Sequence, residues 1–162
     1  MFTLVVLLVA FAARLYTLGD PAFWYDEGLV GWSARLPFLE TARWTAADVH
    51  PPLYFWAVTV WRWLAGESEF ALRLLSASFG LLSVAAVYKI GERLQGPSLG
   101  NLAALFIGLS RFHIWWSQEL RMYILGSMFM LFSIWLTLRI AHGRPRRADW
   151  LAYIGGCLRA GL

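Results

Sequence analysis

Two adjacent carboxylates, Asp26 and Glu27, stand about eight residues after an apolar run that ends near Leu18. Acidic side chains beside a membrane are costly to desolvate and usually have a function there. A carboxylate in this position can act as a general base that takes a proton from an attacking hydroxyl or amine. Asp26 and Glu27 are therefore our candidate catalytic residues.

Polar and positively charged residues that could bind a phosphate-bearing substrate occur in three later segments. Guanidinium groups stabilise the negative charge that develops on a departing phosphate. Pro51 and Pro52 restrict the backbone after a histidine, because proline fixes its own φ and biases the preceding residue toward extended geometry. The candidate substrate-binding residues are His50, Arg73, Glu119 and Arg121.

The candidate residues of the first three segments also have structural interpretations. Asp26 could be an ordinary charged flank of a membrane helix, and Glu27 could be an acidic residue favoured by the dipole of the helix that follows. His50 could form a turn or face lipid headgroups. Arg73 could pair with Glu69, which lies four residues earlier on the same expected helix.

The later segment has its own alternatives, and a metal site is a further one. Glu119 and Arg121 could be loop charges beside an apolar run, and Trp115 and Trp116 have the character of interface anchors. A divalent cation is possible because carboxylate and imidazole side chains could meet around it, although no ligand spacing requires one. The weak candidates for such a metal site are Asp26, Glu119 and His50.

The composition is that of an integral membrane protein. Of the 162 residues, 59% are apolar and only 15% are charged, which leaves too little polar surface to cover a soluble globule. The net charge is +4, but the basic residues are spread among loops, so we expect no nucleic-acid partner. No basic residue precedes the first apolar run, which favours a retained helix over a signal peptide. The single cysteine, Cys157, excludes an intramolecular disulfide.

The apolar runs predict an all-α fold in which several helices cross the membrane. Crossing a bilayer as a helix takes roughly 20 residues, and most of the runs approach this length. No internal repeat or low-complexity linker divides residues 1–162. The expected spans are about 2–18, 70–88, 99–116 and 122–140, with the start of another at 150 and an external interfacial loop over 19–69.

The distribution of charge predicts which loops share a side of the membrane. The loops 89–97 and 139–149 are rich in Lys and Arg, so we expect them in the cytoplasm. Residues 19–69 hold seven acidic residues against three arginines and should lie outside. The run 51–65 is short, begins with two prolines and carries Arg62 among tryptophans, which suits the headgroup zone better than a span. This arrangement places Asp26, His50, Arg73 and Glu119 at or near the outer face.

Four segments together resemble a known family of membrane enzymes. They are Trp24 to Glu27, His50 to Phe55, Phe70 to Ala77 and Phe112 to Tyr123. In this order and spacing they resemble the N-terminal part of GT-C fold glycosyltransferases, above all the family 39 group of dolichyl-phosphate-mannose protein mannosyltransferases and their bacterial relatives. On this resemblance Asp26 is the catalytic base of the first external loop, and Glu119 is the acidic residue of the second.

The resemblance implies a specific reaction. A hexosyl or pentosyl group would move from a polyprenyl-phosphate donor to a lipid, glycan or protein acceptor, with inversion at the anomeric carbon. The active site would be extracytoplasmic, in a multi-pass protein of the cell membrane whose other partners are membrane lipids. Arg111 and Leu120 depart from residues that are common in relatives, and neither departure removes a catalytic group.

Length sets the main alternative. Enzymes of this group have many more membrane helices, so we expect residues 1–162 to be an N-terminal fragment or a truncated product that could be inactive by itself. A non-catalytic small polytopic membrane protein is the second interpretation. A transporter has less support, because the expected helix interiors carry almost no charge besides Arg14.

Overall fold

The computed structural model describes residues 2–20, 22–48, 50–141, 143 and 147–160. These residues form helices and no strands, which confirms the predicted all-α fold. The described helices are α1 (Phe2–Leu15), α2 (Tyr25–Ser33), α3 (Phe38–Ala47), α4 (Leu53–Ala65), α5 (Glu69–Gln95), α6 (Pro97–Leu109), α7 (Arg111–Gln118), α8 (Tyr123–Ala141) and α9 (Arg147–Ala160).

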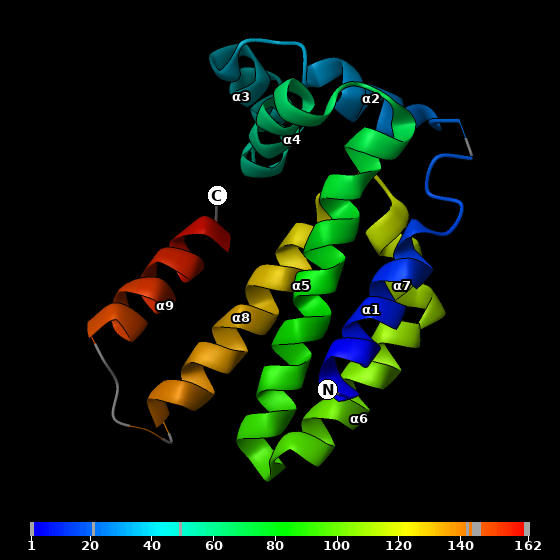
Figure 1. The fold of residues 1–162 in the computed structure, drawn as a ribbon. Helices are drawn as coiled ribbons and strands as arrows, with labels where there is room; N and C mark the ends of the chain where they lie inside the picture. The colour runs from blue at the N-terminus through cyan, green and yellow to red at the C-terminus, as the bar shows by residue number, and fades with distance from the viewer. Residues whose placement is uncertain (1, 21, 49, 142, 144–146, 161–162) are drawn as a thin grey trace.

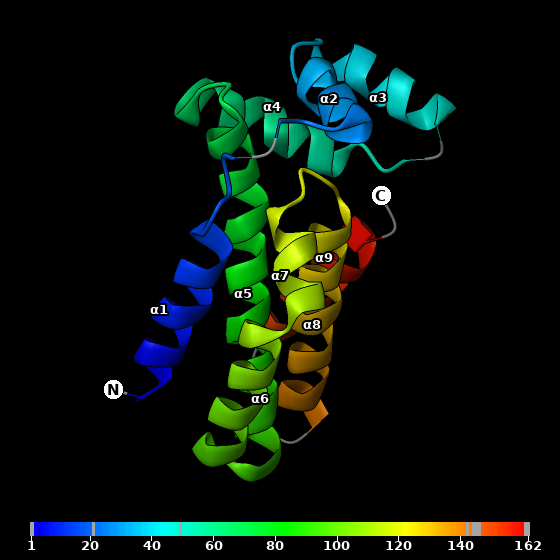
Figure 2. The same ribbon diagram turned by 90° about the vertical axis from the view of Figure 1, so that its right-hand side faces the viewer.

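The helices form an elongated bundle with a helical cap at one end (Figure 1). Helix α5 is central, because it contacts α1, α6, α7 and α8 along its length, and α9 packs on α8. Helices α2, α3 and α4 gather over the end of the bundle where α5 begins, and α4 lies nearly crosswise to α5 in Figure 2. The run 51–65, expected to lie apart from the spans, is therefore part of the cap.

Two of the described helices are long and apolar enough to cross a membrane, α5 with 27 residues and α8 with 19. Helices α1 and α6 are also apolar but shorter, with 14 and 13 residues. Large apolar side chains such as Leu8 and Phe106 point outward from them. An apolar exterior of this kind suits lipid as the solvent, and the chain is a membrane protein.

The expected span 99–116 is divided into α6 and α7 at Ser110. The backbone of Ser110 is extended, with φ −61° and ψ 116°, and its hydroxyl accepts a hydrogen bond from the His113 backbone N–H at 3.4 Å. A serine in this position caps the helix that follows it by satisfying a free N–H group. The structure therefore places a helix boundary inside the expected span, where the apolar α6 gives way to a segment that begins with Arg111.

A tight hairpin joins α5 to α6. Gly96 ends α5 with φ 88°, a conformation that favours glycine, and Pro97 begins α6. A Cβ added to Gly91 would lie 2.8 Å from the Cα of Gly100, and one added to Gly100 would lie 2.7 Å from the Tyr88 carbonyl oxygen. The two backbones are thus in direct contact, as small residues permit between membrane helices.

Two apolar clusters hold the elements together. The larger one joins the cap to α5, α8 and the segment before α8, and its buried members include Val30, Tyr54, Leu72, Leu120 and Leu125. The smaller one joins α1, α5 and α6 through Val6, Ala10, Val84 and Ala104. The cap is therefore part of the packed structure, and its position fixes the residues at the top of the bundle.

The α5–α6 contact gives a prediction for stability. Gly91→Ala should lower the free energy of unfolding by about 1–3 kcal/mol, because the added methyl group meets backbone that must shift. Gly126→Ala is the matched control, since a Cβ on Gly126 in α8 meets nothing within 4 Å. Thermal unfolding in detergent micelles, followed by circular dichroism, compares the two. Equal melting temperatures of the two variants would show that α5 and α6 can move apart to accommodate the methyl group without a loss of stability.

Candidate functional site

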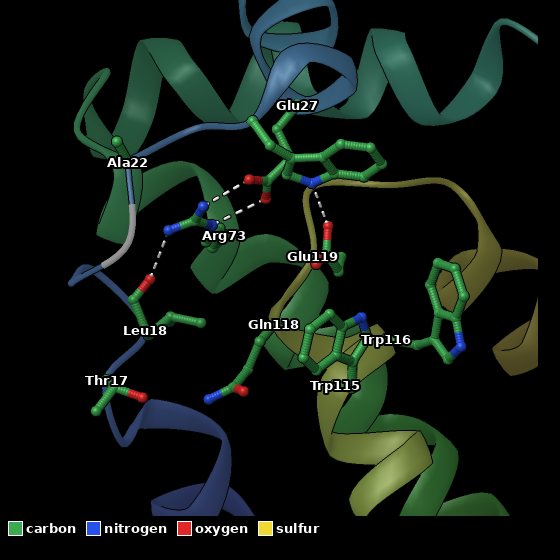
Figure 3. Close-up of a pocket in the computed structure, with 10 residues that line it drawn as sticks. Thr17, Leu18, Ala22, Glu27, Arg73, Trp115, Trp116, Gln118 and Glu119 are labelled. Atoms are coloured by element: carbon green, nitrogen blue, oxygen red, sulfur yellow. Dashed lines mark hydrogen bonds and ion pairs between the residues drawn. The ribbon is translucent and has the colours of Figure 1, made fainter.

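The candidate site lies where the cap meets the bundle. A cavity of about 480 Å³ opens there, beneath the first turn of α2 and beside the start of α5 (Figure 3). Its walls come from the segment after α1, the first turn of α2, helix α5 and the end of α7. The lining residues are Thr17, Leu18, Ala22, Trp24, Glu27, Arg73, Trp115, Trp116, Gln118 and Glu119.

Glu27 and Arg73 form a buried ion pair in the wall of this cavity (Figure 3). Arg73 Nε donates to Glu27 Oε1 at 2.9 Å, and a terminal guanidinium nitrogen donates to Oε2 at 2.5 Å. The two side chains are 5% and 1% exposed. Arg73 also donates to the Leu18 carbonyl at 3.1 Å. The arginine thus pairs with Glu27 across the fold, although a pairing with Glu69 on its own helix was the structural alternative.

Glu27 makes a third contact that reaches the second loop. The backbone N–H of Leu120 donates to Glu27 Oε1 at 2.8 Å. This one carboxylate therefore joins α2, α5 and the segment between α7 and α8. Both of its oxygens are hydrogen-bonded, which gives Glu27 the geometry of a positioning group.

Glu119 faces the same cavity and is held by an indole. Trp24 Nε1 donates to Glu119 Oε2 at 2.6 Å (Figure 3). Burial raises the pKa of Glu119, and the hydrogen bond from Trp24 opposes that rise. The segment before α2, which holds Trp24, is thus in contact with the segment after α7, which holds Glu119. These are the two external loops to which the family resemblance assigned acidic residues.

Asp26 is not among the residues that line this cavity, and it pairs with Arg121. A guanidinium nitrogen of Arg121 lies 3.2 Å from Asp26 Oδ2, and the two side chains are 14% and 33% exposed. Asp26 and Glu27 both belong to the first turn of α2. Neighbouring residues on a helix point about 100° apart because a turn takes 3.6 residues, so the two carboxylates reach different arginines. Asp26 keeps more access to solvent than Glu27.

His50 is not joined to the other candidate residues by any contact that the structure describes. Its Nδ1 lies 3.0 Å from Asp48 Oδ2, and its ring packs edge-on against Phe55. The described residues contain no group of three His, Cys, Asp or Glu side chains that could hold a metal ion. Asp26, Glu119 and His50 therefore do not form a metal-binding group in this structure.

The structure adds residues to the site that the sequence did not assign. Trp24 orients Glu119, and the Gln118 amide donates to the carbonyls of Arg14 at 3.2 Å and Tyr16 at 2.7 Å. Gln118 thus fastens the end of α7 to the end of α1. Both residues stand in segments that carry the family resemblance, Trp24 beside Asp26 and Glu27 and Gln118 beside Glu119, and that position was a usable signal for each.

The arrangement contains the parts that transfer to an attacking nucleophile requires. A partly accessible carboxylate, Asp26, pairs with Arg121 at 3.2 Å and is the neighbour in α2 of Glu27, which lines the cavity together with Arg73 and Glu119. A carboxylate can accept a proton, and a guanidinium can stabilise negative charge on a leaving group. All five residues lie at one end of an apolar bundle.

Comparison with known proteins gives one finding on the family. A family model described as dolichyl-phosphate-mannose-protein mannosyltransferase matches residues 49–161. Neither the curated proteins nor the solved structures gave a match. The matched range begins after α3 and includes Arg73, Glu119 and Arg121 but not the Asp26 and Glu27 pair.

The buried pair gives a prediction that separates it from a surface pair. Glu27→Gln should lower the free energy of unfolding by about 3–5 kcal/mol, because it leaves the buried charge of Arg73 without its counter-charge. Glu67→Gln is the matched control, since Glu67 pairs with Arg35 and Arg62 while remaining exposed. The control should be much milder in thermal unfolding. A similar loss from both substitutions would contradict the special position of Glu27.

Proposed function

Because the chain belongs to the dolichyl-phosphate-mannose-protein mannosyltransferase family and is thus a membrane glycosyltransferase of GT-C type, we propose that it moves a sugar from a polyprenyl phosphate to an acceptor. The reaction takes place at the extracytoplasmic face and inverts the anomeric carbon. The acceptor is a hydroxyl or amine of a lipid, glycan or protein. One observation carries the proposal: the partly exposed Asp26, paired with Arg121, adjoins Glu27 in α2, and Glu27 lines the cavity together with Arg73 and Glu119.

In the proposed reaction Asp26 is the general base. Its carboxylate takes the proton of the acceptor while the acceptor oxygen or nitrogen forms a bond to the anomeric carbon. The bond from that carbon to the phosphate oxygen breaks at the same time, and the electron pair leaves with the lipid phosphate. Attack on the face opposite to the phosphate produces inversion. Arg121, 3.2 Å from Asp26, would hold the carboxylate in one orientation between turnovers.

The other residues receive roles that follow from their contacts. Arg73 supplies positive charge to the cavity wall for the departing phosphate, while Glu27 holds the guanidinium in place through two hydrogen bonds. Glu119, oriented by Trp24, is a hydrogen-bond partner for the sugar hydroxyls. His50, in the connection between α3 and α4 of the cap, is assigned a peripheral substrate-binding role in this proposal.

The main prediction for activity concerns Asp26. Asp26→Asn should retain donor binding but reduce sugar transfer by about 10²- to 10⁴-fold, because the amide keeps the shape of the side chain and cannot accept the proton. The assay measures transfer of labelled sugar from a polyprenyl-phosphate donor in reconstituted membranes, in parallel with donor binding. Asp20→Asn, an exposed aspartate in the segment after α1, is the matched control and should transfer at the parental rate.

Two results would contradict this assignment. Transfer by Asp26→Asn at the parental rate would exclude the carboxylate as the base. An absence of transfer by the parental chain, together with normal donor binding, would favour the non-catalytic alternative for residues 1–162.

The proposed sidedness has its own prediction. Ala65 at the end of α4 and Gln95 at the end of α5 are both exposed and lie at opposite ends of α5. In a Cys157→Ser background, Ala65→Cys should react with an impermeant maleimide on intact cells, whereas Gln95→Cys should react only after permeabilisation. The basic residues Lys89 and Arg93 are the physical reason, since basic loops remain in the cytoplasm. The opposite labelling pattern would place the cavity on the cytoplasmic side.

A further inference from the structure

A second polar cluster lies inside the bundle and has no part in the proposed reaction. Arg14, near the end of α1, is completely buried. Its guanidinium donates to the carbonyl oxygens of Ala10 at 2.6 Å and Gly108 at 3.1 Å and to the Ser117 hydroxyl at 3.2 Å. Among the described residues no carboxylate pairs with it. A buried cation without a counter-charge is costly, which makes the surroundings of Arg14 a place where an anion is favoured.

The contact between Arg14 and His113 fixes the proton on the imidazole. A terminal guanidinium nitrogen of Arg14 lies 2.7 Å from His113 Nδ1. A guanidinium has only donors, so Nδ1 must be the acceptor and the ring proton must lie on Nε2. His113 is consequently a neutral donor through Nε2, and the cation behind it polarises that N–H. It cannot take a proton at Nε2 while this contact is present, so it is not a second general base.

The Nε2–H of His113 lies at a groove between α7 and α8. This α7–α8 groove has a volume of about 340 Å³ and is lined by Phe112, His113, Trp116, Tyr123, Ile124 and Ser127. The His113 side chain is buried, with 7% of the residue's surface exposed. Its Nε2 has no hydrogen-bond partner in the described part of the chain. Buried donors are nearly always satisfied in native proteins, so an unpaired one in the wall of a groove indicates a missing acceptor.

The chemistry of the missing acceptor follows from the walls. Aromatic and aliphatic side chains cover most of the groove, and Phe112 and Tyr123 at its rim are exposed on the outside of the bundle. Aromatic residues in such positions sit at the headgroup level of a bilayer. The occupant must therefore combine an apolar chain with an oxygen acceptor, and the charge of Arg14 favours an anionic one.

We propose that the α7–α8 groove is a binding site for an anionic phospholipid, which places a phosphate oxygen on His113 Nε2 and an acyl chain against the aromatic wall. A single hydrogen bond in an open groove gives modest affinity, which suits an abundant membrane lipid better than a scarce lipid-linked sugar. The groove is distinct from the cavity below the cap and shares only Trp116 with it. The inference does not depend on the proposed function.

Native mass spectrometry of the detergent-purified chain tests the site. The parental chain should retain phosphatidylglycerol about tenfold better than diacylglycerol with the same acyl chains, which lacks the phosphate, as expected for one hydrogen bond to a charged group. Ser127→Phe fills the groove without touching the Arg14–His113 contact and should abolish this preference. Thr137→Phe, an exposed position on α8 outside the groove, is the matched control and should keep it.

A second variant removes the donor itself. His113→Phe keeps an aromatic ring but lacks the Nε2–H, so it should lose the tenfold preference as Ser127→Phe does, and its melting temperature reports whether Arg14 still packs. Equal retention of the two lipids by the parental chain would overturn the proposal. Displacement of phosphatidylglycerol by equimolar polyprenyl monophosphate or by inorganic phosphate would also overturn it, because the groove would then select another phosphate source.

Discussion

The arrangement of the candidate site depends on the ion pair between Glu27 and Arg73, which fastens the cap to the bundle. Each charge is buried, so neither can be moved away from the other without leaving an unpaired ion in an apolar environment. The third contact, from the Leu120 N–H, brings the segment after α7 under the same constraint. A buried pair of this kind contributes little net stability, because desolvation offsets the attraction. Its physical effect is to favour one position of α2 over all others.

This constraint separates two carboxylates that look equivalent in the sequence. Glu27 uses both oxygens for contacts within the protein, whereas Asp26, one residue earlier, turns toward Arg121 and stays partly accessible. The neighbouring position of the two residues is what produces the difference, since a helix directs consecutive side chains to different sides. Glu27 is thus suited to hold the site, and Asp26 is suited to meet a substrate.

The sequence was sufficient to predict the helical class, because that depends on composition and on the spacing of apolar runs. The interfacial position of the run 51–65 stays a prediction. The sequence could not predict which arginine pairs with which acid. Arg73 has Glu69 at helical spacing, but Glu27, from a distant segment, forms the two-hydrogen-bond pair with it, because the packing of the cap on α5 brings α2 to that position. The break at Ser110 was also not predicted, although Ser110 and Arg111 interrupt the apolar run there and the serine hydroxyl caps the helix that follows. Arg14 carried a signal, as a charge within an apolar run, but its partners lie about 100 residues later in the chain.

The length of α5 has a consequence for the height of the candidate site in a bilayer. At 1.5 Å per residue its 27 residues rise about 40 Å, roughly 10 Å more than the hydrocarbon core. Arg73 is the fifth residue of that helix, so in the proposed arrangement, with α5 crossing the bilayer, its guanidinium would lie in the layer of the lipid phosphates. A lipid-linked substrate could therefore present its phosphate to the cavity by lateral diffusion alone, with its chain still among the other lipids. The energetic cost of lifting a long hydrocarbon chain into water would not enter the reaction.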